Sequence, residues 1–180
     1  MRGLNMSVQY EKRRLYRLKE LEDYKVADED VDVRGWDVYD MDKEKFGTIR
    51  DLIVDPEVEK VRYLDVIATS DLSVRGGERH LLIPVGVARI DGEEDKVFIS
   101  EIDKDLLKKY PDYKGAAVTR DYEHTIVETL RGQRPSDVSE EEFYNHELYS
   151  DKDFYGARKD FSLIHSDRYS TAYRSAPPEK

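Results

Sequence analysis

The sequence predicts a mainly β fold, a small antiparallel β-barrel with short helices and an extended C-terminal region. Apolar runs of strand length alternate with clusters of Asp, Glu, Gly and Pro between residues 31 and 102, as in a series of hairpins. Charged residues make up 39% of the 180-residue chain, but most apolar residues are concentrated between residues 31 and 107. This concentration is sufficient for the core of one domain with extensions.

Six segments in this region have the composition of strands, and four turn-rich connections separate most of them. The expected strands are residues 33–39, 45–55, 60–69, 79–85, 87–91 and 96–100. The expected turns are residues 40–44, 55–57, 75–78 and 91–95, where Asp, Pro and Gly favour tight bends. Gly47 inside a strand predicts a bulge or sharp bend, and Pro84 predicts a strand end because it cannot donate to a ladder.

Two strands are apolar on both faces, at residues 52–54 and 81–83. One face fills the interior of a small barrel. The other face needs a cover, which the N-terminal arm, the C-terminal region or a second subunit could supply. This pattern favours a homo-oligomer.

The flanking segments have a different character from the barrel. Leu15, Leu18 and Leu21 have the spacing of one or two helical turns that dock on the barrel. Helices are expected at residues 103–110 and 122–130, and a capping box at Ser139 opens a third. The last six residues are expected to be disordered. The expected divisions are an N-terminal arm, the barrel, a helical extension that packs on it and a Tyr-rich tail, at residues 1–30, 31–102, 103–148 and 149–180.

Charge and cysteine content limit the possible functions. The net charge of −10 divides into +3 for residues 1–26, −10 for residues 27–101 and −3 for residues 102–180. Direct nucleic-acid binding is therefore not expected, and the acidic barrel would suit a basic partner or the chain's own basic arm. The absence of cysteine excludes disulfides and thiolate chemistry. We find no signal peptide and no transmembrane segment, so we expect a soluble cytoplasmic protein.

The acidic turns and the scattered histidines are weak candidates for chemistry. Asp40, Asp42, Glu44 and Asp51 have carboxylates at calcium-loop spacing, but Lys45 replaces the required glycine, which favours a hairpin turn. The turn at residues 91–95 is interpreted in the same way. His80, His124, His146 and His165 do not have metal-ligand spacing, and His80 is expected at the barrel edge or in the core.

The loop at residues 75–79 could hold a phosphate through backbone amides and two guanidinium groups, but a hairpin loop is favoured. Ser73, Ser100 and Ser162 lack the sequence context of a hydrolase nucleophile. We therefore assign no catalytic, cofactor-binding or metal-binding residue, expect no cofactor, and predict that the chain is not an enzyme.

Five segments together resemble the PRC-barrel family, over about residues 31–102. They are Gly35-Trp36-Asp37-Val38-Tyr39-Asp40, Phe46-Gly47-Thr48-Ile49, Asp51-Leu52-Ile53-Val54-Asp55, Val61-Arg62-Tyr63-Leu64-Asp65-Val66, and Leu82-Ile83-Pro84 with Ala88-Arg89-Ile90. The residues that we expect to determine this structure are Trp36, Gly47, Leu52, Val54, Tyr63, Leu64 and Pro84.

The resemblance implies an interaction or assembly module with an unidentified protein partner. The family includes the barrel of the photosynthetic reaction centre H subunit, and residues 118–123 are similar to the segment that follows that barrel. An accessory role in photosynthetic electron transport is therefore one alternative. A role in ribosome maturation is another, because one family member is the C-terminal domain of such a factor. The arm and the Tyr-rich tail resemble those of free-standing relatives grouped with stress-associated proteins.

Overall fold

The computed structural model describes residues 14–22, 24, 26, 31–73, 76–152 and 154. Within these ranges, seven strands form one sheet, and the expected mainly β fold with short helices is confirmed. The two longest strands coincide with the two longest expected strands, and most of their residues are buried. The strands are β1 (Tyr16–Arg17), β2 (Asp37–Tyr39), β3 (Lys45–Asp55), β4 (Lys60–Ala68), β5 (His80–Pro84), β6 (Ala88–Asp91) and β7 (Lys96–Ile99).

The strand order is β5-β4-β3-β2-β7-β6, with β1 paired separately to β3. One pairing differs from the expected antiparallel arrangement, because β2 pairs with β7 in parallel, with Val38 opposite Val97. A parallel pair needs a long crossover, and here the crossover is the whole segment from β3 to β6. The first expected strand is also shorter than predicted, since Trp36 N–H closes a turn on the Val33 carbonyl at 3.1 Å before β2 begins.

A bulge next to Gly47 bends the β2–β3 hairpin, as predicted. The register shifts between Val38 and Tyr39, which lie opposite Gly47 and Lys45. Gly47 is also required by space, because an added Cβ would lie 2.5 Å from the Ile67 carbonyl oxygen. Pro84 ends β5, where it needs to donate no ladder bond.

The N-terminal arm joins the sheet as a strand and does not form the expected α-helical turns. Tyr16 lies opposite Val54 in an antiparallel pairing, and a 3₁₀ turn, η1 (Leu18–Glu20), follows. Leu15 and Leu18 are buried, so the predicted docking through these leucines is correct although the backbone conformation was not. Pairing with β3 satisfies backbone groups that an isolated short helix would leave to water.

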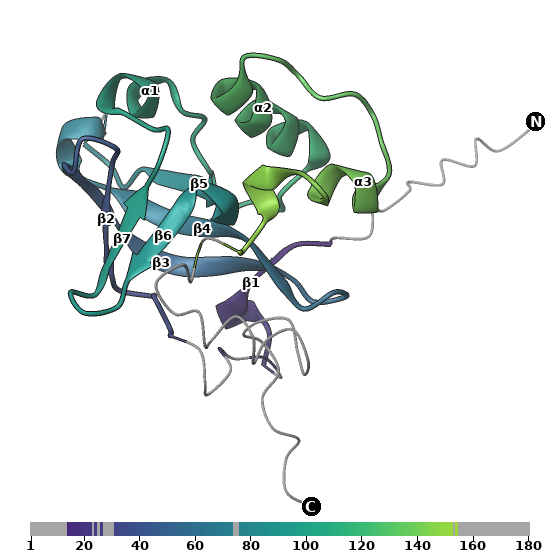
Figure 1. Ribbon diagram of the computed structural model, residues 1–180, viewed down its shortest axis with the longest axis horizontal. Helices are drawn as coiled ribbons and strands as arrows, with labels where there is room; N and C mark the ends of the chain where they lie inside the picture. Colours follow the sequence, from purple (N-terminus) through teal and green to yellow (C-terminus); the bar gives the residue numbers. More distant parts are fainter. Residues whose placement is uncertain are drawn as a thin grey trace, which may run out of the picture.

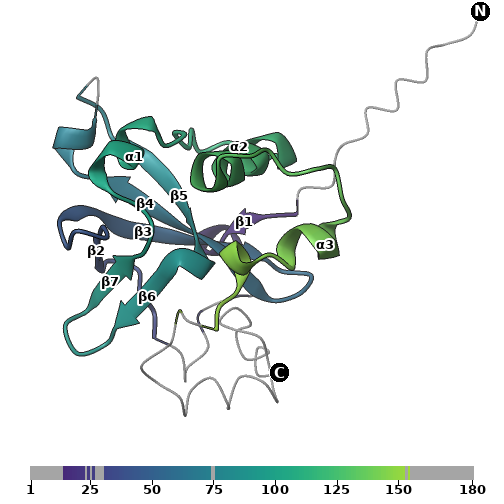
Figure 2. The ribbon, with the colours of Figure 1, turned by 45° about the horizontal axis from the view of Figure 1, so that its top comes forward.

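In the described part of the chain, three α-helices follow the barrel strands. Each helix begins at a side-chain cap: Asp103 before α1 (Lys104–Lys109), Thr119 before α2 (Arg120–Arg131) and Ser139 before α3 (Glu140–Tyr144). Figures 1 and 2 show α1 and α2 on one side of the β3–β5 strands, with the β6–β7 hairpin on the other. Together with the arm, these elements cover the outer face of the two-sided strands, so the cover is supplied within the chain.

Three short segments fill the sheet edge between β5 and β6, which do not pair with each other in the described residues. A 3₁₀ turn, η3 (Val85–Val87), links the two strands directly and packs against a second one, η4 (Glu147–Tyr149). Gly86 allows this contact, because an added Cβ would lie 2.1 Å from the Glu147 carbonyl oxygen. Further along, Ile90 N–H donates to the Phe154 carbonyl at 2.9 Å. The rest of the predicted Tyr-rich tail lies outside the described residues.

Removal of the Thr119 cap is expected to weaken α2. In Thr119→Ala, the Tyr122 N–H loses its acceptor, now 3.2 Å away, and the free energy of unfolding should fall by about 1 kcal/mol. Urea denaturation followed by circular dichroism measures this change. Thr125→Ala in the same helix is the matched control, because Thr125 Oγ1 only donates back to the Asp121 carbonyl. Equal losses in the two variants would contradict the capping role.

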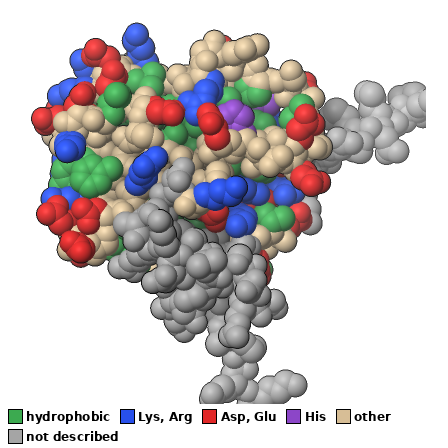
Figure 3. All heavy atoms as spheres, in the orientation of Figure 1, with side chains coloured by type: hydrophobic (Ala, Val, Ile, Leu, Met, Phe, Trp, Pro, Cys, Tyr) green, Lys and Arg blue, Asp and Glu red, His purple; other side chains and the backbone are tan. Residues whose placement is uncertain are grey.

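The surface is polar and of mixed charge. Figure 3 shows acidic and basic side chains interspersed over one face of the molecule. The described part of the chain exposes three large hydrophobic side chains, Met41, Val58 and Val138, which are far apart in the sequence. None of the helices in the described ranges has the length and apolar character needed to cross a membrane.

Candidate ligand-binding cavity

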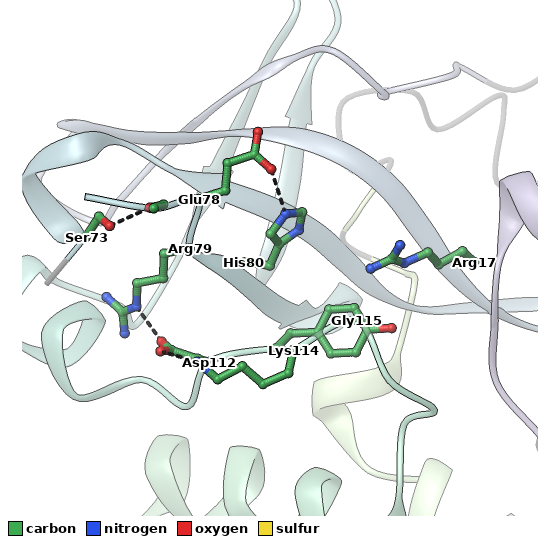
Figure 4. A pocket seen from close by; sticks show the side chains of 10 residues that line it. Arg17, Ser73, Glu78, Arg79, His80, Asp112, Lys114 and Gly115 are labelled. Carbon is green, nitrogen blue, oxygen red and sulfur yellow. Dashed lines mark hydrogen bonds and ion pairs between the residues drawn. The ribbon is translucent and has the colours of Figure 1, made fainter. Parts of the chain in front are cut away.

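A cavity of about 540 Å³ lies at the outer edge of β5, among side chains from the arm, the barrel and the extension. A bridge between His80 and Tyr113 holds the extension against this edge, with Tyr113 N–H donating to the His80 carbonyl at 2.8 Å. Figure 4 shows His80 between Glu78 and Arg17. The lining residues are Arg17, Ser73, Gly77, Glu78, Arg79, His80, Asp112, Tyr113, Lys114 and Gly115.

Arg79 forms a wall of the cavity, and each of its guanidinium nitrogens has a partner. Its Nε donates to Asp112 at 2.5 Å, and its two Nη atoms donate to the carbonyls of Leu72 and Tyr110 at 3.0 and 2.8 Å. Burial acts to raise the pKa of Asp112, but the hydrogen bond and charge of Arg79 outweigh it and lower that pKa. Arg79 therefore joins the start of β5 to the extension, and each of its three guanidinium nitrogens is held by one hydrogen bond.

Asp65 contacts two of the side chains that line the cavity, those of His80 and Arg17. This carboxylate is fully buried on β4, and its Oδ1 lies 2.7 Å from His80 Nδ1. Its Oδ2 lies 3.8 Å from Arg17 Nε, which is an ion-pair distance. Among the described residues, neither of these two atoms has a hydrogen-bond partner. Both ring nitrogens of His80 therefore face carboxylates, Asp65 at 2.7 Å and Glu78 at 3.5 Å.

Tyr113, Lys114 and Glu78 complete the rim. The Arg17 guanidinium lies over the Tyr113 ring, 5.2 Å from its centroid. Burial raises the pKa of the Tyr113 hydroxyl, although Arg17 acts to lower it. Lys114 Nζ lies 3.3 Å from Asp112, and Glu78 Oε2 lies 3.5 Å from His80 Nε2. The rim therefore combines cations, carboxylates and an aromatic hydroxyl, which suits a polar ligand.

The sequence predicted part of this site. His80 lies at the barrel edge as expected, but the phosphate-binding alternative for residues 75–79 is only partly met. Arg79 is occupied, and Arg75 lies outside the described residues. The contributions of Arg17, Tyr113 and Lys114 were missed, because segments far apart in the sequence bring them to β5. The excess of basic residues in the arm was the only signal for Arg17.

The acidic turns serve as turns. Asp40 Oδ1 accepts from the backbone N–H groups of Asp42 and Glu44 at 2.9 and 3.0 Å, and Asp91 Oδ1 accepts from Glu93 N–H at 3.1 Å. Asp51, the fourth residue of the calcium-like spacing, is buried in β3. No group of three or more His, Asp and Glu side chains in the described residues could hold a metal ion.

The basic arm contacts the acidic barrel. The charge of the barrel predicted either this contact or one with a basic partner. Arg14 Nε lies 2.6 Å from Asp55 Oδ2, and Asp55 is fully buried at the end of β3. Arg62 Nη2 lies 3.9 Å from the same oxygen. Together with the contact between Arg17 and Asp65, these pairs compensate two buried carboxylates, which would otherwise be costly to ionise.

A second polar cluster lies under the extension. Glu123 is 3% exposed, and its Oε1 accepts from the hydroxyls of Tyr63 and Tyr144 at 3.0 and 2.6 Å. Its Oε2 lies 3.0 Å from Arg120 Nη1, and the Tyr63 and Tyr149 hydroxyls are 2.7 Å apart. Burial raises the pKa of Glu123 to about 7, against the lowering effects of Arg120 and the two hydroxyls. No pattern in the sequence indicated that this glutamate is buried.

Comparison with known proteins identifies the domain. Residues 25–106 match the PRC-barrel domain family. A protein of Deinococcus radiodurans described as uncharacterized is 28% identical over 136 residues. That match covers 75% of this chain and 46% of the relative, so the chain spans about half the length of that relative. The segments that carried the resemblance lie in β2 to β6, within the matched range. Residues 25–106 therefore form a PRC-barrel domain.

Proposed function

We propose that this chain is a non-enzymatic interaction module, in which the PRC-barrel is a rigid scaffold and the cavity beside β5 binds a segment of a partner protein. The observation that carries this proposal is the construction of the cavity. Its wall side chains come from the arm, the barrel and the extension, and Asp112 and the buried Asp65 hold Arg79 and His80 in place. Side chains fixed in this way can bind a partner with little ordering cost.

The contacts of His80 support binding over catalysis. Among the described residues, its ring nitrogens contact Asp65 and Glu78, both of them carboxylates. Among the hydroxyl-bearing side chains that line the cavity is that of Ser73. Its Oγ donates to the Gly77 carbonyl at 2.5 Å. A nucleophile activated by histidine needs a hydrogen bond between the two groups, and the described contacts do not include one.

A charge reversal at the rim tests the proposal. Lys114 is 80% exposed and contacts Asp112, so Lys114→Glu should change the cavity without unfolding the chain. The full chain is purified by affinity from its native cell, and the recovered material is sized by light scattering and identified by mass spectrometry. Recovery of a stoichiometric partner should fall about tenfold in the variant, equivalent to about 1.4 kcal/mol of binding free energy.

Lys45→Glu is the matched control, because Lys45 is also an exposed lysine paired with one aspartate, Asp37, but it lies on the β2–β3 hairpin. Equal recovery of the partner with the wild type, Lys114→Glu and Lys45→Glu would show that the cavity is not part of the interface. If the partner is a second copy of this chain, light scattering will show a homo-oligomer that dissociates in Lys114→Glu and persists in Lys45→Glu.

A further inference from the structure

The charges around the cavity are balanced, and the contacts show which ones are already neutralised. Arg79 and Asp112 form an ion pair at 2.5 Å, within the wall. Arg17 Nε forms an ion pair with the buried Asp65, at 3.8 Å. Two exposed charges of opposite sign remain at the mouth of the cavity, on Lys114 and Glu78. The balance of the site therefore depends on where the Glu78 carboxylate lies.

Glu78 is held loosely. Its side chain is 66% exposed, and its contact with His80 Nε2 is 3.5 Å long, whereas Asp65 approaches the other ring nitrogen to 2.7 Å. In the described part of the chain, the contact with His80 is the one ion pair that Glu78 forms. Rotation of Glu78 into water would cost little, since surface ion pairs contribute less than about 1 kcal/mol. The cavity would then have an excess of one positive charge beside an imidazole nitrogen.

We propose that the cavity binds a carboxylate group of an acidic peptide segment, in the position that the Glu78 carboxylate now occupies beside His80. The proposal rests on the proposed function and names the chemistry of the partner. Glu78 acts as an internal competitor, so the apparent affinity is reduced by the fraction of time that its carboxylate occupies the site. Lys114 supplies the opposite charge at the rim, and Arg17 supplies guanidinium N–H groups on the arm side.

A hexaglutamate peptide is a direct probe, with hexaglutamine as the neutral control. Binding to the full chain is measured by calorimetry at an ionic strength of about 0.15 M, where charges beyond about 8 Å are screened. The chain has a net charge of −10, so non-specific attraction of hexaglutamate is not expected. Histidine ring resonances report whether His80 senses the peptide.

Glu78→Gln should tighten hexaglutamate binding about fivefold, because it removes the competing charge. Lys114→Gln should weaken binding by a similar factor. Glu93→Gln, at an exposed position in the β6–β7 turn, should leave binding unchanged. The gain of affinity in Glu78→Gln is the decisive result, since damage to the fold would weaken binding instead.

Three results would overturn this inference: no binding of hexaglutamate to any variant, equal binding of hexaglutamine, or an unchanged affinity in Glu78→Gln. Tighter binding of inorganic phosphate than of the peptide would also overturn it, and would assign the site to a phosphate group. If Lys114→Glu loses the native partner but hexaglutamate does not bind, the proposed function is retained and the inference of a carboxylate ligand is overturned. If hexaglutamate binds but recovery of the native partner is unchanged in Lys114→Glu, the carboxylate site is retained and the proposed function is overturned.

Discussion

The free energy of unfolding is expected to fall by about 3 kcal/mol as the pH rises from 4.5 to about 7, because of one buried carboxyl group, Glu123. In this range the folded chain keeps a proton on Glu123 that the unfolded chain, with a pKa near 4.5, has already released. Unfolding therefore releases a proton, and raising the pH favours the unfolded state. The contribution is fully present below pH 4.5 and is lost as the pH passes the folded pKa.

The position of Glu123 explains why burial outweighs its partners. The Arg120 guanidinium lies 3.0 Å away, but it also pairs with Glu140 and lies 3.8 Å from the Phe143 ring centroid. Its charge is therefore shared between two carboxylates. The hydroxyls of Tyr63 and Tyr144 can donate to ionised Glu123, but their hydrogen bonds do not replace the water that the carboxylate loses.

Urea denaturation at a series of pH values between 4 and 8, on the wild type and on Glu123→Gln, measures this effect. The stability of the variant minus that of the wild type should rise by about 3 kcal/mol across this range, because glutamine does not titrate. Glu128→Gln, at an exposed position of the same helix, should follow the wild-type profile. Parallel profiles for Glu123→Gln and the wild type would show that Glu123 does not titrate there.

Gly86→Ala is expected to destabilise the chain by about 3 kcal/mol, since it forces apart two backbone segments that fill the sheet edge between β5 and β6. The added Cβ would lie 2.1 Å from the Glu147 carbonyl oxygen and 2.5 Å from the Leu148 carbonyl carbon. Backbone atoms cannot rotate away as a side chain can. The strain should therefore displace η4 and uncover Leu148, which is now fully buried.

Gly77→Ala is the matched control. An added Cβ at Gly77 meets nothing within 4 Å, and Gly77 has no positive φ, so its stability should change by less than about 1 kcal/mol. Urea denaturation gives both values, and limited proteolysis should cut Gly86→Ala near η4 before the barrel. Equal stability of the two variants would mean that η4 is not needed at this edge.

The local pattern of residues determined the strands and turns of this protein. Strand-like composition between turn residues predicted β3 and β4 almost to their ends, because the Asp and Pro residues of the turns favour bends where each strand stops. Asp40 was correctly assigned to a turn, and Ser139 to a helix start, since each acts on backbone groups a few residues away. The resemblance to the PRC-barrel family rests on the same local segments.

The tertiary structure decided everything that depends on which segments meet. The parallel pairing of β2 with β7, the strand conformation of the arm and the contact of Gly86 with η4 each join residues far apart in the sequence. The cavity and the Glu123 cluster arise in the same way. A residue type shows its own preferences, but burial and charge compensation depend on its neighbours in space. Residues such as Arg17 and Glu123 therefore have sequence contexts typical of surface residues, and only the fold gives them partners.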